Sequence, residues 1–215
     1  MNIYFTGRGT HLADTLARAA ALRGFQVSSV ADAELVFVAD DVLRHDKLDE
    51  VFRSFNWVRT QCLRAAAIII ASQVPPGTVR QLRQSNPVMV LFYQVDTIIV
   101  DRAVARARAP EQFIVGCSDP GQTLPLAYQE YLAAHECPVH QMSYESAEMA
   151  KLAINYVLTK QIEAACELSE ACKRAGANYV DVEHAMRCDA RIGRHAYLRP
   201  GEPNQHLLRD VKTVR

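Results

Sequence analysis

The stretch NIYFTGRGTHLADTLARAAALRG, residues 2–24, decides the fold class. Its first part, residues 2–7, is rich in β-branched and aromatic side chains and ends in a glycine, as strands commonly do. From Thr10 onward the apolar residues recur at helical spacing, and Gly24 supplies a stop signal. This stripe comprises Leu12, Leu16, Ala19, Ala20 and Leu22. A strand, a glycine turn and a helix in that order predict the first β–α unit of an α/β domain.

The same alternation continues to residue 116. Further strands are expected at residues 25–30, 33–40, 67–72, 88–93 and 113–116, separated by helices at 48–66, near 78–85 and around 101–109. The segments 33–40 and 67–72 are almost wholly apolar, which is typical of strands buried on both faces. The pattern therefore predicts an α/β fold with a parallel sheet and helices on both of its faces.

The second half of the chain changes character. A helical pattern runs from Ser143 to residue 175, with serines able to cap its start, acids in its first turns, and Lys173, Arg174 and Gly176 at its end. Residues 178–189 read as a second helix of the same module. We therefore expect two domains, an α/β domain at 1–140 and a helical module at 141–215. The long 143–175 helix is the expected surface for forming a homodimer.

Composition excludes several classes of function. The 215-residue chain has a formal net charge of zero, so it lacks the basic excess of a nucleic-acid-binding protein. Its six cysteines match no metal-binding or redox spacing, which predicts reduced thiols, no metal site and a cytoplasmic location. The N-terminus does not resemble a signal peptide, and the apolar run at 65–71 is too short to span a membrane.

The glycine turn resembles the phosphate-binding loop of dinucleotide-binding domains. That loop has the pattern G-x-G-x-x-G between a strand and a helix, and Gly7 and Gly9 occupy its first two positions. Leu12 stands at the third position. An acid for the ribose hydroxyls is expected about 20 residues on, where Asp32 is the candidate. The alternatives are a glycine turn that binds no ligand and an Asp32 that caps the next segment.

Lys151 and Asn155 are a second candidate site. They are four residues apart in the long helical segment, so they share one face of it. An ammonium and a carboxamide side by side can hold a water molecule or stabilise a developing oxyanion. The alternative is an ordinary solvated helix face.

Several segments together resemble the UDP-glucose/GDP-mannose dehydrogenase family. They are ASQVPPGT at 71–78, the long run SAEMAKLAINYVLTKQIEAACELSEACKRAGANYVDV at 146–182, DARIGRHAYLRPG at 189–201 and RDVKTV at 209–214. The resemblance implies a Rossmann-like NAD-binding domain, a central helix with a dimerising helical module, and a further domain that completes a nucleotide-sugar site. It also implies oxidation of a nucleotide sugar at C6 to the uronate with two NAD.

The resemblance also assigns roles to individual residues. Lys151 and Asn155 match the family's catalytic lysine and asparagine, and Arg191 lies in its R-I-G turn, near bound substrate. Pro76 and Gly77 belong to a loop that lies beside the nicotinamide in the family. Asp96 corresponds best to the family's acid–base glutamate, one methylene shorter.

Three departures bear on activity. The passage between the second and third strands is short, so NAD binding is expected to be weak or lost. The C-terminal nucleotide-sugar domain is absent from this sequence. Counting back from Arg209 and Asp210, His206 occupies the position of the catalytic cysteine, whose thiolate forms the thiohemiacetal. We expect an impaired nucleotide-sugar 6-dehydrogenase; the alternatives are a non-catalytic dimerising or regulatory homologue and, more distantly, a β-hydroxyacid dehydrogenase-like enzyme.

Overall fold

The structure is a computed structural model that describes residues 1–46, 48–62, 64–98 and 102–214. The chain forms two compact units, Met1–Lys151 and Leu152–Arg215. The sequence places its domain boundary near residue 140, before the long helix, whereas the structure assigns the first turns of that helix to the first unit.

A seven-stranded sheet organises the first unit, in the order β2-β1-β3-β4-β5-β6-β7. Its strands are β1 Asn2–Phe5, β2 Gln26–Val27, β3 Leu35–Val38, β4 Ala67–Ile70, β5 Leu91–Val95, β6 Phe113–Cys117 and β7 Val139–Ser143. All neighbouring pairs are parallel except β5 and β6, which are antiparallel. The predicted α/β class is confirmed, with one antiparallel pairing in a sheet that was expected to be wholly parallel.

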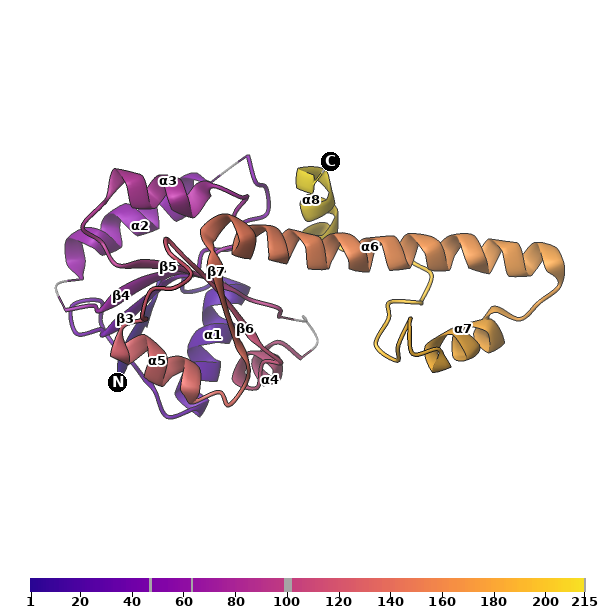
Figure 1. Cartoon of the computed structure of the whole chain (residues 1–215), viewed down its shortest axis with the longest axis horizontal. Coiled ribbons are helices and arrows are strands. Elements are labelled where there is room, and N and C mark those ends of the chain that lie inside the picture. Colours follow the sequence, from indigo (N-terminus) through magenta and orange to yellow (C-terminus); the bar gives the residue numbers. More distant parts are fainter. Residues whose placement is uncertain (47, 63, 99–101, 215) are drawn as a thin grey trace. The chain divides into compact units, whose positions relative to one another are not determined.

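Helices cover both faces of this sheet (Figure 1). They are α1 His11–Leu22, α2 Asp49–Gln61, α3 Thr78–Ser85, α4 Ala103–Arg108 and α5 Leu126–Ala133. Helices α2 and α3 lie on one face, and α1, α4 and α5 lie on the other. Alternate strand residues serve the two faces, so Phe37 and Ile69 join the cluster that contains α1 and α5 residues. The strands β3 and β4 are buried along their whole length, as their unbroken apolar sequence predicts.

Several strand boundaries differ from the sequence prediction. Strand β2 covers only Gln26–Val27 of the expected 25–30, and β5 begins at Leu91 rather than residue 88. Strand β7 and helix α5 were not predicted. The five residues of β7, VHQMS, are half-exposed or exposed at the edge of the sheet, so their sequence lacks the apolar run that marks the buried strands.

The connection from β2 to β3 is short, although β1 lies between these two strands in the sheet. Val27 pairs with Ile3 of β1 on one side, and Leu35 pairs with the same Ile3 on the other. Residues 28–34, all of them described, connect the two strands through turns and without a helix. Parallel strands usually need a longer crossover that contains a helix. The short connection is sufficient here because β2 pairs only with the first residues of β1.

The long helix α6, Tyr144–Ala175, spans 32 residues. Ser143 caps its start, because the Ser143 hydroxyl oxygen accepts the Ser146 N–H at 3.2 Å. Its end follows the predicted pattern, since Gly176 has φ +71° and the Ala177 N–H reaches the Cys172 carbonyl at 2.9 Å. The second unit contains the rest of α6 from Leu152, together with α7 Tyr179–Cys188 and α8 Gln205–Val214. The predicted long helix and the helix at 178–189 are confirmed.

The described residues offer neither a metal-binding cluster nor a membrane-spanning helix. Within those ranges, no group of three or more His, Cys, Asp or Glu side chains is arranged to hold a metal ion. None of the helices built from described residues has the length and apolar character needed to cross a membrane.

Candidate functional site

The glycine turn lies at the carboxyl end of β1, the edge where α/β sheets place their ligands. Gly7 and Gly9 both adopt left-handed conformations, with φ +67° and +95°. A Cβ on Gly7 would lie 2.7 Å from the backbone oxygen of Ala39, so only glycine fits this approach to the end of β3. Among the described residues, no heavy atom lies within 4 Å of a Cβ placed on Gly9. The turn therefore has the backbone shape of a dinucleotide-binding loop, and Gly9, its second glycine, faces open space.

The side of this turn that would receive a phosphate carries a carboxylate. Thr10 caps α1, and the Gly9 N–H donates to Asp14 Oδ1 at 3.3 Å. The Arg8 guanidinium pairs with the same Asp14 oxygen at 3.1 Å. A cavity of about 680 Å³ opens beside the turn, lined by residues of α1 and the start of α4, among them Arg18 and Arg102. The turn fits NAD in its backbone shape, but Asp14 places a like charge where an anionic pyrophosphate would lie.

Asp32 lies away from this turn. The Asn2 side chain donates to the Asp32 carbonyl at 3.4 Å, and Asn2 is the first residue of β1. Gly7 and Gly9 follow the last residue of β1, so the strand separates Asp32 from them. The Asp32 carboxylate instead accepts the Ser29 hydroxyl at 2.7 Å. The structure thus does not bring together the residues that the sequence offered as phosphate loop and ribose acid.

The segment Pro75–Thr78 forms a tight turn before α3. The Thr78 N–H reaches the Pro75 carbonyl at 3.3 Å, and Gly77 has φ +92° and ψ −11°. Proline at the second position and glycine at the third are what a type II turn demands. The Gly77 and Val79 N–H groups donate to the two carboxylate oxygens of Glu148, at 2.7 and 2.9 Å. The turn is therefore attached to the start of α6.

Asp96 and Lys151 interact in the first unit. Asp96 follows the end of β5, and its Oδ2 atom is buried without a hydrogen-bond partner among the described residues. Burial raises the pKa of Asp96 to about 6, and the opposing influences are the Lys151 ammonium followed by the Ile98 and Thr97 N–H groups. The Lys151 side chain is itself buried. A carboxyl that titrates near neutrality beside a buried ammonium has the electrostatics of an acid–base pair.

Asn155 belongs to a buried network in the second unit. The Asn155 amide donates to Asp210 Oδ2 at 2.5 Å, and Arg209 Nε donates to Asp210 Oδ1 at 2.6 Å. The Asp210 side chain is completely buried, and Arg209 is 7% exposed. Because Asp210 fixes the amide nitrogen, it also fixes the direction of the Asn155 carbonyl oxygen. Asn155 is therefore a rigid polar group and not a solvated surface residue.

His206 lies at the edge of the same network. It is the second residue of α8 and half-buried, and its Nδ1 lies 3.5 Å from Arg209 Nη1. A guanidinium can only donate, so this contact requires a lone pair on Nδ1. Through Arg209 and Asp210, the imidazole is connected to Asn155.

Arg191 has a different environment from the other site candidates. It follows α7 in an exposed turn, where its guanidinium pairs with Asp189 at 2.7 and 3.0 Å. The side chain of Arg191 is 89% exposed. Gly193, with φ +87°, completes the turn. Arg191 is thus presented to solvent on the surface of the second unit.

Known proteins of one family resemble this chain in sequence. Residues 145–204 match the model for the UDP-glucose/GDP-mannose dehydrogenase family, central domain. The chain is 24% identical over 183 residues to UDP-glucose 6-dehydrogenase YwqF of Bacillus subtilis, covering 80% of this chain and 41% of that protein. The chain is thus similar, over its central segment, to the UDP-glucose/GDP-mannose dehydrogenase family.

Solved structures support the same fold. A UDP-D-ManNAc dehydrogenase from Pyrococcus horikoshii superposes with a TM-score of 0.79 at 15% identity, over 98% of this chain and 63% of that one. A 3-hydroxyisobutyrate dehydrogenase from Mycobacterium tuberculosis gives 0.64 at 14% identity, over 88% and 70% of the two chains. At these identities the likeness shows the fold alone. The chain spans about two-fifths of the length of its Bacillus relative.

Three residues with notable contacts were not singled out from the sequence. Glu148 lies in the central-helix motif, and Asp210 lies in the RDVKTV segment, but neither was assigned a contact. Asp14 was not assigned a role. The signal available for Glu148 was its place in an apolar helix beside Ala147 and Ala150, since an acid there is buried only with a partner. Glu148 and Asp210 each have a partner more than 50 residues away in the sequence, where residue spacing gives no guide.

Proposed function

We propose that this chain is a nucleotide-sugar dehydrogenase homologue that binds NAD weakly and does not complete the oxidation to the uronate. Similarity to the family's central domain and to a UDP-glucose 6-dehydrogenase supports the general class of oxidoreductase. The specific proposal depends on how this chain departs from the family at its glycine turn and at the position of the nucleophile.

His206 carries the proposal. The family pattern places a cysteine three residues before the arginine or lysine that precedes the buried aspartate, and here the imidazole of His206 occupies that position. The second oxidation in the family proceeds through a sulfur–carbon bond to the aldehyde, and an imidazole cannot form a thiohemiacetal. Its Nδ1 lone pair is moreover directed to Arg209, 3.5 Å away. Lys151 in the first unit, and Asn155 and Asp210 in the second, remain buried polar groups.

Weak NAD binding has separate support in the first unit. The Gly9 N–H is already engaged by Asp14, whose negative charge opposes a pyrophosphate. The connection at residues 28–34 forms no helix, and Asp32 lies at the opposite end of β1 from the glycines. The glycine turn therefore keeps its backbone shape, but a free Gly9 N–H for the pyrophosphate and a nearby acid for the ribose are both missing.

We also propose that the protein forms a homodimer through the second unit. Val157 and Leu168 on α6 are 54% and 40% exposed, and their spacing of eleven residues puts them on one helix face. Val180 at the start of α7 is 67% exposed. Apolar side chains exposed on one helix face offer a surface that a second copy of the chain can cover. Light scattering that gives a monomer at every concentration tested would contradict the dimer.

The decisive experiment measures turnover and binding on the same preparation. UDP-glucose and GDP-mannose are incubated with the protein and NAD, and both NADH and uronate are quantified. The expected result is no uronate, together with an NAD dissociation constant above the micromolar range by calorimetry. Uronate formation that scales with protein concentration and disappears in Lys151→Ala would overturn the non-catalytic interpretation.

A second candidate function is oxidation of a small β-hydroxyacid. It is favoured by one observation, namely that Lys151 and Asn155 are retained as buried polar groups while no thiol is needed for a single two-electron oxidation. The shared fold of a 3-hydroxyisobutyrate dehydrogenase is compatible with it. NADH production from a β-hydroxyacid, without any from nucleotide sugars, would select this function.

A further inference from the structure

Glu148 makes an unusual connection between two distant elements. It lies in the second turn of α6 and is completely buried. Its Oε2 accepts the Gly77 N–H at 2.7 Å, and its Oε1 accepts the Val79 N–H at 2.9 Å. The first amides of a helix need acceptors, which a serine or aspartate immediately before the helix usually supplies. The residue before α3 is Gly77, which has no side chain, so a carboxylate from α6 fulfils this role.

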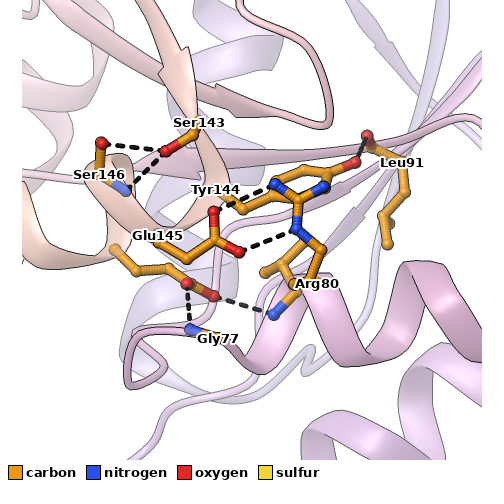
Figure 2. A network of polar contacts seen from close by, with 9 residues as sticks. Gly77, Arg80, Leu91, Ser143, Tyr144, Glu145 and Ser146 are labelled. Carbon is orange, nitrogen blue, oxygen red and sulfur yellow. Dashed lines mark hydrogen bonds and ion pairs between the residues drawn. The ribbon is translucent and has the colours of Figure 1, made fainter.

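A second set of contacts surrounds this carboxylate (Figure 2). Arg80 of α3 pairs with Glu145 of α6 through two hydrogen bonds, at 2.8 and 3.1 Å. The same guanidinium lies 5.0 Å from the ring centre of Tyr144, and the Tyr144 hydroxyl donates to the Leu91 carbonyl at 2.6 Å. The start of α6 thus contacts α3 through Glu145 and the start of β5 through Tyr144. Among these α6 side chains, Glu148 is the one that binds the Pro75–Thr78 turn.

We propose that Glu148 is a positioning residue that holds the Pro75–Thr78 turn and the start of α3 against the first turns of α6. The turn follows β4 at the carboxyl edge of the sheet, the same edge that carries the glycine turn. The consequence for ligand binding rests on the proposed function, because it assumes that a dinucleotide binds at this edge. Removing the carboxylate then loosens one wall of the cofactor site without touching the glycine turn.

The connection also links the turn to the Asp96–Lys151 pair. Lys151 follows Glu148 by three residues on α6, so one short segment of helix carries both groups. Glu148 fixes the turn to this segment, and Lys151 interacts with Asp96 at the end of β5. A displacement of the turn therefore acts on the same helix segment that orients the buried ammonium.

The hold on the turn depends on pH. Burial raises the pKa of Glu148 to about 7, although the Val79 and Gly77 N–H groups oppose this shift. The charged groups that face it are Glu145 on its own helix, which raises the pKa, and Arg80 on α3, which lowers it. When the turn opens, the carboxyl becomes hydrated and its pKa falls toward that of a free glutamate. Ionisation therefore favours the open turn, and the hold weakens as pH rises from about 4.5 to about 7.

Hydrogen exchange of the full chain tests this role directly. Protection factors at Gly77 and Val79, corrected for intrinsic exchange at each pH, are measured between pH 5 and pH 8. In the wild type we expect protection to fall by about tenfold or more between pH 5 and pH 7 and then to level off. In Glu148→Gln the fall in protection assigned to Glu148 should disappear, because the group at this position no longer titrates. Glu148→Ala should lose about tenfold or more at every pH, since both amides lose their acceptor.

Glu145→Gln is the matched control, because it breaks the pair with Arg80 but leaves both bonds from Glu148. It should retain the pH dependence of the wild type. A pH dependence that persists in Glu148→Gln would overturn the proposal. So would a loss of protection in Glu145→Gln as large as in Glu148→Ala, because general docking of α6 would then hold the turn. If a variant fails to fold, the wild type still tests the proposal, because exchange at Gly77 and Val79 as fast as in an unstructured chain would show that nothing holds the turn.

A parallel NAD titration separates this inference from the proposed function. If the turn forms a wall of the cofactor site, Glu148→Ala weakens NAD binding severalfold relative to Glu145→Gln. If the wild type binds no NAD at all, the cofactor part of the proposed function fails. The exchange data still decide whether Glu148 holds the turn.

Discussion

The buried network around Asp210 and the glycine turn around Gly9 respond differently to changes in sequence. Asp210 and its two partners are buried and interlocked by hydrogen bonds of 2.5 and 2.6 Å. The glycine turn keeps Gly7, which cannot change without a clash, yet next to it Asp14 has its side chain 49% exposed and Leu12 stands at the third glycine position. A change at Asp210 would leave the buried Arg209 charge without its partner, whereas a change at the half-exposed Asp14 would alter a charge that water already screens.

The largest effect is expected from Asp210→Ala. It removes the carboxylate that pairs with Arg209 and holds the Asn155 amide, at a site excluded from water. Losing one partner of a buried ion pair costs about 3–5 kcal/mol of unfolding free energy. Chemical denaturation followed by circular dichroism measures it. The control is Asp189→Ala, which removes the partner of the exposed Arg191 and should change stability little. Equal losses in the two variants would refute the contrast between buried and exposed pairs.

The next largest effect is expected from Gly7→Ala. A Cβ at this position lies 2.7 Å from the Ala39 oxygen, in a backbone with φ +67°. Strain of this kind costs about 2–3 kcal/mol, which denaturation again measures. Gly9→Ala is the matched control, because Gly9 also has a positive φ but faces open space. If the two alanine variants were equally stable, the close approach to β3 would not be the reason for glycine at position 7.

Asp96 predicts a pH-dependent stability in the first unit. Its pKa is raised to about 6 in the folded protein, so the native state binds more protons than the unfolded state between about pH 4 and pH 6. The unfolding free energy should therefore decrease as pH rises from about 4 to about 6, by on the order of 2 kcal/mol. Asp96→Asn should remove this part of the pH dependence, whereas Glu130→Gln, an exposed acid on α5, should leave it unchanged. Parallel stability curves for the wild type and Asp96→Asn would contradict the raised pKa.

The sequence predicted the features that depend on local pattern. The apolar strands at 35–38 and 67–70, the capped helix that begins after Ser143, and the family motifs were all readable from residue type and spacing. Asp32 shows where such reasoning stops, because its distance in sequence from Gly9 fitted a ribose acid while the short connection to β3 placed it at the other end of β1. Glu148 and Gly77 are 71 positions apart in the sequence, so local residue spacing could not predict their contact.

The smallest effect concerns Asp14, and it tests the glycine turn as a binding surface. In Asp14→Asn the carboxamide oxygen can still accept the Gly9 N–H, so the turn keeps its shape while the negative charge is lost. Removing one exposed like charge near a bound pyrophosphate should tighten NAD binding by roughly threefold to tenfold at low salt, and less at high salt. Calorimetry at two salt concentrations measures this change. Asp32→Asn is the control and should leave the affinity unchanged, because Asp32 lies beyond the other end of β1. If Asp32→Asn weakened NAD binding while Asp14→Asn left it unchanged, the cofactor would bind at the opposite edge of the sheet. The reason for glycine at position 7 would then be its close approach to Ala39, and not a role in binding.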